Sequence, residues 1–234
     1  MTEQMDLYLS VREFLQIWEK KNRLKIESRM TPQFAGILHE LPDEYFSYLH
    51  EKVGDVKSSL DRFRPQATLN EDTAVVRLNR KSGRIDIGMK LVNEQWMVNE
   101  IAAESSRNED HLTSMVKSAD ALRSVAIFLK GYGEGDKNLI ENVTEKNFFT
   151  NAIVPGQLTD VSLPGTSSLT KESQMVIRGN RIDVDIPFNE QVASITLREI
   201  NREEGKWKQP GFHITDVSLQ QMGGMKVSEN FLRY

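Results

Sequence analysis

Cysteine is missing from the chain, and histidine is scarce, with four residues among 234. The absence of cysteine excludes disulfides, thiolate nucleophiles, iron–sulfur clusters and cysteine-ligated zinc. The histidines are not spaced as metal ligands; they are His39, His50, His111 and His213. The sequence therefore predicts no metal site and no cofactor.

Long hydrophobic runs are also missing. The longest apolar runs are a few residues, far below the ~20 needed to span a bilayer. The first ten residues, MTEQMDLYLS, lack the basic and apolar regions of a signal peptide. We expect a soluble protein that does not bind membranes. It would be cytoplasmic if Met1 is the native start, and extracytoplasmic if a signal or anchor has been removed.

An excess of positive charge is absent as well. Thirty lysines and arginines stand against thirty-four acidic residues, which gives a net charge of -4. A protein that binds nucleic acid through phosphates ordinarily carries a basic patch or an excess of basic residues. We therefore do not expect nucleic acid as a partner.

The sequence contains the same order of predicted elements twice, with helices followed by strands. Val11, Phe14, Leu15 and Trp18 have helical spacing and predict a helix that ends near Asn22. Thr31 before Pro32 predicts the start of another helix. Alternating, β-branched segments follow between residues 67 and 101 and predict an antiparallel meander. A long apolar stripe then predicts a helix over about 110–132, with Thr144 as the N-cap of a shorter helix. Strands return from residue 175 to 219.

Individual residues support an internal repeat. Five positions recur at an offset of 114 residues: Val11 and Val125, Phe14 and Phe128, Leu15 and Leu129, Trp18 and Tyr132, Phe34 and Phe148. The segment 84–87 (RIDI) matches 181–184 (RIDV) at an offset of 97, and Trp96, Val98, Glu100 and Ile101 are echoed by Trp207, Ile214, Asp216 and Val217. The order of elements predicts two copies of one unit. The expected units are residues 1–108 and 109–234.

A unit of helices followed by a curved antiparallel sheet resembles the nuclear transport factor 2-like (NTF2-like, cystatin-like α+β) superfamily. The residues that carry the resemblance are Phe14, Leu15, Trp18, Phe34 and 96–101 in the first unit, and Phe128, Leu129, Tyr132, Phe148 and 207–217 in the second. The resemblance implies an α+β fold of two tandem NTF2-like units. It also implies a cone-shaped apolar pocket in each unit and a pairing of the two halves as an intrachain pseudo-dimer.

Two groups of residues are candidates for a site. Trp18, Phe34, Tyr45, Tyr132 and Phe148 would line an apolar pocket, or would simply form the core. Asp183 and Asp185 lie two apart on a predicted strand and share a face. They would serve as an acid pair or cation ligands, or else belong to a solvated sheet face with Arg181 as counter-charge.

No motif of a nucleophilic or acid–base enzyme is present, and no catalytic residue is predicted. We therefore expect a non-catalytic binding or protein-interaction module that holds a small apolar ligand or a protein partner. The alternative is a pocket enzyme. It would resemble the ketosteroid isomerase and dehydratase members of the superfamily, which pair a carboxylate base with an oxyanion donor.

Overall fold

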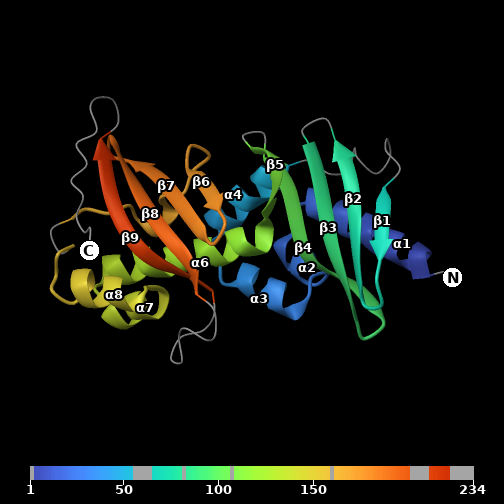
Figure 1. The fold of residues 1–234 in the computed structure, drawn as a ribbon, viewed down its shortest axis with the longest axis horizontal. Coiled ribbons are helices and arrows are strands. Elements are labelled where there is room, and N and C mark those ends of the chain that lie inside the picture. Colours follow the sequence, from blue (N-terminus) through green and yellow to red (C-terminus); the bar gives the residue numbers. More distant parts are fainter. Residues whose placement is uncertain are drawn as a thin grey trace. The chain divides into compact units, whose positions relative to one another are not determined.

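A computed structural model describes residues 3–54, 65–80, 83–105, 108–158, 161–200 and 211–221. The fold is α+β, with several helices and two antiparallel sheets (Figure 1). The chain divides into two compact units. The first comprises residues 1–40 and 49–119, and the second comprises 41–48 and 120–234.

The first unit combines one long helix and several shorter ones with a five-stranded sheet. The helices are α1 (Glu3–Glu19), α2 (Arg23–Glu27), α3 (Pro32–His39) and the end of α4 (Asp43–Val53). The strands are β1 (Gln66–Leu69), β2 (Thr73–Arg80), β3 (Gly83–Val92), β4 (Gln95–Ser105) and β5 (Asn108–Ser114). They pair in sequence order, so the sheet is the predicted meander with one further strand.

The second unit likewise combines helices with an antiparallel sheet. Its helices are most of α6 (Met115–Glu134), then α7 (Lys137–Val143), α8 (Lys146–Phe148), a π-helical turn at Phe149–Ile153 and a 3-10 turn at Thr166–Ser168. The sheet contains β6 (Gln174–Arg178), β7 (Arg181–Phe188), β8 (Gln191–Ile200) and β9 (Gly211–Gln221) in sequence order. Trp207 lies outside the described residues.

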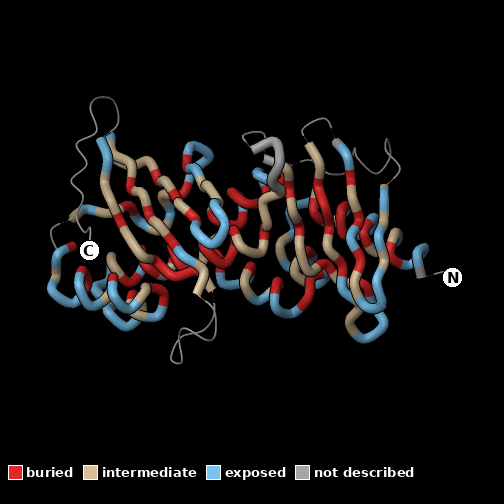
Figure 2. The backbone as a smooth tube through the Cα atoms, viewed as in Figure 1, coloured by how far each residue is buried: buried red, intermediate tan, exposed pale blue. Residues whose placement is uncertain are grey.

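Each unit buries one stripe of its long helix and one face of its sheet, as the periodicities predict. Figure 2 shows buried and less buried residues alternating along the strands. Ile85 and Ile87 of β3 are at most 1% exposed, and so are Phe14 and Trp18 of α1. In the second unit, Ile182, Val184 and Ile186 of β7 are buried to the same degree as Phe128 of α6.

One strand of each sheet has two local features in common. Met30 forms an isolated parallel bridge with Val98 of β4, and Thr144 forms one with Ile214 of β9. A register shift interrupts the pairing of β4 just after Val98 and that of β9 just after Ile214, which leaves one extra residue in each strand. The bridges lie at offsets of 114 and 116 residues. β4 therefore occupies in its unit the place that β9 occupies in the other.

This correspondence corrects the match of 84–87 with 181–184. The first segment lies in β3, next to the bulged β4, whereas the second lies in β7, which β8 separates from the bulged β9. The two segments are similar because both are half-buried strands that lead into a hairpin. Asn93 and Glu94, like Asn189 and Glu190, have positive φ at both turn positions, as a tight hairpin turn requires.

Three local predictions are also corrected. Residues 108–114 form β5, which pairs with β4, and α6 begins only at Met115. Glu19 ends α1, and a separate helix α2 follows, capped by Asn22, whose side chain accepts the N–H of Lys25 at 3.1 Å. The N-cap of α8 is Glu145 rather than Thr144, whose hydroxyl donates backward to the Ile140 carbonyl at 2.8 Å.

Candidate functional site

The candidate site is the polar face of the second sheet. The apolar residues of β7 point to the core, so the alternation of the strand places Asp183 and Asp185 on the opposite face. The registers align Asp183 with Thr196 of β8 and Thr196 with Asp216 of β9. One row of polar side chains thus crosses three neighbouring strands.

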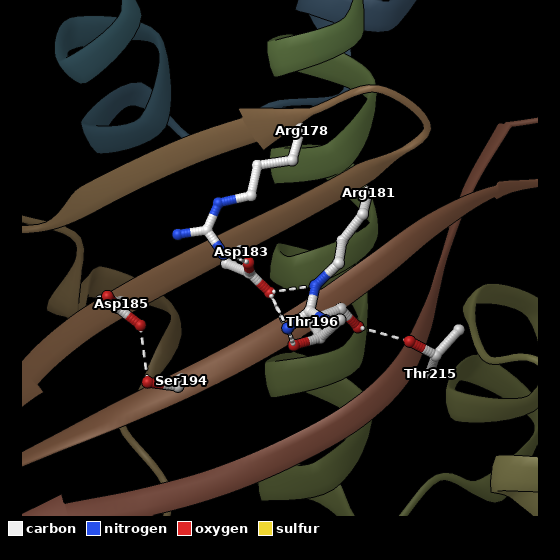
Figure 3. Close-up of polar contacts among 7 residues, drawn as sticks. All are labelled: Arg178, Arg181, Asp183, Asp185, Ser194, Thr196 and Thr215. Carbon is white, nitrogen blue, oxygen red and sulfur yellow. Dashed lines mark hydrogen bonds and ion pairs between the residues drawn. The ribbon is translucent and has the colours of Figure 1, made fainter. Parts of the chain in front are cut away.

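Asp183 is the most heavily bonded residue of this row (Figure 3). Its Oδ1 accepts from Arg181 Nε at 2.9 Å and from the Thr196 hydroxyl at 2.8 Å, and Arg178 Nη1 lies 3.9 Å from its Oδ2. The Asp183 side chain is only 17% exposed. Its acceptor capacity is therefore largely used by its own neighbours, as in a structural ion pair.

Asp185 is held separately from Asp183. Its Oδ1 accepts a hydrogen bond from the Ser194 hydroxyl at 2.6 Å, on the adjacent strand (Figure 3). Among the described residues, no group of three potential metal ligands converges anywhere. The two aspartates do share a face, but the contacts connect them to different neighbours rather than to one bound ion or proton.

Asp216 is the third carboxylate of the face. Burial raises its pKa, and the nearby Asp183 adds to the rise, although the backbone N–H of Val217 and the charge of Arg181 act in the opposite direction. Its Oδ1 is enclosed and has no hydrogen-bond partner among the described residues. The sequence predicted Asp216 only as the repeat counterpart of Glu100 and did not predict it as a site residue.

The outermost charges of this face are arginines. The registers place Arg178, Arg181 and Arg198 directly beside one another on β6, β7 and β8; we call these three residues the arginine row. The side chains of Arg178 and Arg181 are 69% and 52% exposed, and Arg198 is also exposed. Like charges directly opposite one another destabilise a sheet, and the single carboxylate of Asp183 offsets only part of the charge of the three arginines. The row cannot be recognised in the sequence, because only the strand register brings the three arginines side by side.

The first sheet has a different polar face. Asp86 is 9% exposed and accepts from Arg84 Nη2 at 2.9 Å and from Arg77 Nε at 3.3 Å. Glu100, the counterpart of Asp216, accepts the backbone N–H groups of Met115 and Val116 and so caps the start of α6. Its carboxylate therefore caps a helix, whereas the Asp216 carboxylate accepts the backbone N–H of Val217 and leaves Oδ1 without a partner among the described residues.

The five aromatic candidates lie in two groups. Trp18 and Phe34 belong to the first unit and are each 1% exposed; Tyr45, Tyr132 and Phe148 belong to the second. Trp18 packs with Phe14, Val53 and Ile101 around a space that is too small for a water molecule. Side chains fill this space.

The two tyrosines are placed differently within the second unit. Tyr45 is fully buried, and burial together with the neighbouring Glu44 raises the pKa of its hydroxyl. The Tyr132 hydroxyl hydrogen-bonds to the carbonyl oxygens of Leu158 and Val161, which fixes the connection that follows the π-helical turn. The hydroxyl of Tyr132 is thus used for structure.

The glycine-rich segment 131–135 forms a helix end. α6 continues to Glu134, and Gly135 has φ +69° as it ends. A Cβ on Gly131 would lie 2.9 Å from Leu139 Cβ, so this glycine permits the close approach of α7.

No protein-family model, curated protein or solved structure matches the chain. Among the described residues, no helix is both long and apolar enough to cross a membrane. The function must therefore be argued from the geometry of the two units.

Proposed function

We propose that the protein is a non-catalytic binding module, made of two tandem NTF2-like units, whose arginine row binds an acidic segment of a partner protein. The observation that carries the proposal is the alignment of Arg178, Arg181 and Arg198 on three adjacent strands. The side chains of Arg178 and Arg181 are more exposed than that of Asp183, with which both form ion pairs. A partner approaching this face would meet positive charge first.

The tandem arrangement is supported by the shared geometry of β4 and β9. Both strands receive a parallel bridge from a segment between helices, and both carry an extra residue at the same point. The backbone N–H groups of Thr31 and Glu145 donate to the carbonyls of Val98 and Ile214, each at 2.8 Å. These agreements lie at offsets of 114 and 116 residues, at or near the offset of the helical pattern, and favour duplication over chance.

The non-catalytic assignment is supported by the state of the polar groups. Asp183 and Asp185 are bonded to neighbours, and the space beside Trp18 and Phe14 in the first unit is too small for a substrate. A ketosteroid isomerase-like site would need a carboxylate and a tyrosine facing one apolar cavity. Guanidinium groups that bind carboxylates in pairs suit a recognition surface better.

The test measures binding of fluorescein-labelled hexaglutamate by anisotropy at low and at moderate salt. Arg198→Glu reverses an exposed charge of the row, and Lys130→Glu makes the same charge change on an exposed position of α6. We expect salt-sensitive binding that Arg198→Glu weakens by about tenfold or more and that Lys130→Glu leaves within about twofold. Equal losses in the two variants, or no binding at low salt, would overturn the proposal.

A further inference from the structure

A polar cavity of about 210 Å³ opens on the first unit, away from its core. Asp6 and Ser10 of α1 line one side, and Ser28 and Arg29 line another. Glu94 and Trp96, from the β3–β4 turn and the start of β4, complete it. The lining thus includes two acidic residues, two serines and Arg29, whose guanidinium also pairs with Glu13.

The edge of β4 is exposed to this cavity. Val98 N–H donates to the Arg29 carbonyl at 2.9 Å, and the Val98 carbonyl accepts from Thr31, so both groups point away from β3. Because backbone groups alternate in an antiparallel strand, Trp96, two residues earlier, directs its N–H and carbonyl to the same side. The registered pairing of β5 with β4 begins only at Ala102.

In the second unit, the backbone groups at the corresponding edge have hydrogen-bond partners. Phe212 lies two residues before Ile214, as Trp96 lies two before Val98. The Phe212 N–H donates to Asp120 Oδ2 at 2.9 Å, and its carbonyl accepts from the Ser124 hydroxyl at 2.6 Å. Asp120 and Ser124 both belong to α6, so this helix closes its own sheet edge with a carboxylate and a hydroxyl.

The first unit has the same two residue types at the 114-residue offset, Asp6 and Ser10. Ser10 instead donates to the carbonyl of Asp6 at 2.9 Å, and Asp6 is exposed. Within the described part of the chain, neither residue makes the corresponding bond to Trp96. The cavity lies where the closing contacts of the second unit would be.

We propose that this cavity binds a zwitterion of the size of a small free amino acid. The ligand carboxylate would take the place that the Asp120 carboxylate has in the second unit, accepting from Trp96 N–H with Arg29 nearby. Its ammonium group would face Asp6 and Glu94 and donate to the Trp96 carbonyl. The cavity volume of about 210 Å³ is many times the space that a single water molecule needs, so a ligand of this size has room there.

The test follows the Trp96 amide by ¹H–¹⁵N NMR in the full chain during titration with L-serine. N-acetyl-L-serine lacks the ammonium group, and ethanolamine lacks the carboxylate. We expect a saturable shift with L-serine alone, weakened by about fivefold or more in Asp6→Asn because the ammonium loses its counter-charge. Glu71→Gln, an exposed acid that does not line the cavity, should change the affinity by less than about twofold.

Three outcomes would overturn the proposal. They are the absence of a saturable shift up to about 50 mM L-serine, equal binding of N-acetyl-L-serine, and unchanged affinity in Asp6→Asn. The experiment uses no residue of the arginine row. Failure of the hexaglutamate test and failure of the serine test are therefore independent.

Discussion

The carboxylate of Asp120 accepts a hydrogen bond of 2.9 Å from the backbone N–H of Phe212, across 92 residues of sequence. Asp120 also lies 2.8 Å from Arg123 Nη2, and the whole residue is only 9% exposed. Gly211 makes this approach possible, because a Cβ there would lie 2.7 Å from Asp120 Oδ2. This carboxylate, together with the Ser124 hydroxyl, thus attaches the long helix of the second unit to its sheet.

Asp120→Ala should therefore destabilise the protein. It leaves the N–H of the buried Phe212 without its acceptor, a loss of about 1–3 kcal/mol. The free energy of unfolding in urea measures the change. Asp6→Ala removes the corresponding but exposed carboxylate of the first unit and should cost less than about 0.5 kcal/mol. Similar losses in the two variants would contradict the role given to Asp120.

Much of the fold follows from the sequence because burial imposes a period. The stripes of α1 and α6 and the alternation of β3 and β7 appear in the structure with the expected faces buried. β5 was missed because its sequence, NEDHLTS, has no apolar alternation and the strand lies at the edge of its sheet. Its pairing with β4 depends on tertiary contact rather than on local preference.

The candidate site was only half visible in the sequence. Asp183 and Asp185 could be placed on one face from their spacing, and Arg181 could be named as a counter-charge. The arginine row and the position of Asp216 depend on which residues face one another across strands. Register is a property of the folded sheet, so neither could be read from one strand alone.

Two glycines of α6 should respond in opposite ways to alanine. A Cβ on Gly131 would meet Leu139 and Ile140 at 2.9 and 3.0 Å, whereas one on Gly133 would meet nothing within 4 Å. Gly131→Ala should cost about 1–3 kcal/mol through overpacking. Gly133→Ala should stabilise by up to about 1 kcal/mol through helix propensity. Thermal unfolding of both variants checks this, and a stable Gly131→Ala would contradict the close contact of α6 and α7.

His50 should make the protein sensitive to acid. Its ring stacks on Trp18 with centroids 4.5 Å apart, and because a carbonyl only accepts, Nε2 must carry the proton that it donates to the Trp18 carbonyl at 2.8 Å. Burial lowers the pKa of His50 below 6.5, although that hydrogen bond acts in the opposite direction. The unfolded chain therefore binds the proton more readily, and stability falls as the pH drops through about 6.5.

His50→Gln keeps a donor at this position but cannot titrate. Urea unfolding between pH 7.5 and pH 5 should show a smaller loss of stability in this variant than in the wild type. His39→Gln removes an exposed histidine that contacts Glu27. This variant should still lose stability at acidic pH to the same extent as the wild type, because His50 is unchanged. An identical pH dependence in wild type and His50→Gln would exclude His50 as its source.

The contribution of Asp216 to stability should change with pH in the direction opposite to that of His50. Since burial raises its pKa in the folded state, the folded protein holds this proton more tightly, and the associated stability is lost as the pH rises through the folded pKa. Asp216→Asn should therefore be more stable than the wild type at pH 7. The gain should stay below about 1 kcal/mol because solvent screens a partly exposed group. Paired denaturation curves should show the gain shrinking toward pH 3, and a gain independent of pH would mean that packing is responsible rather than charge.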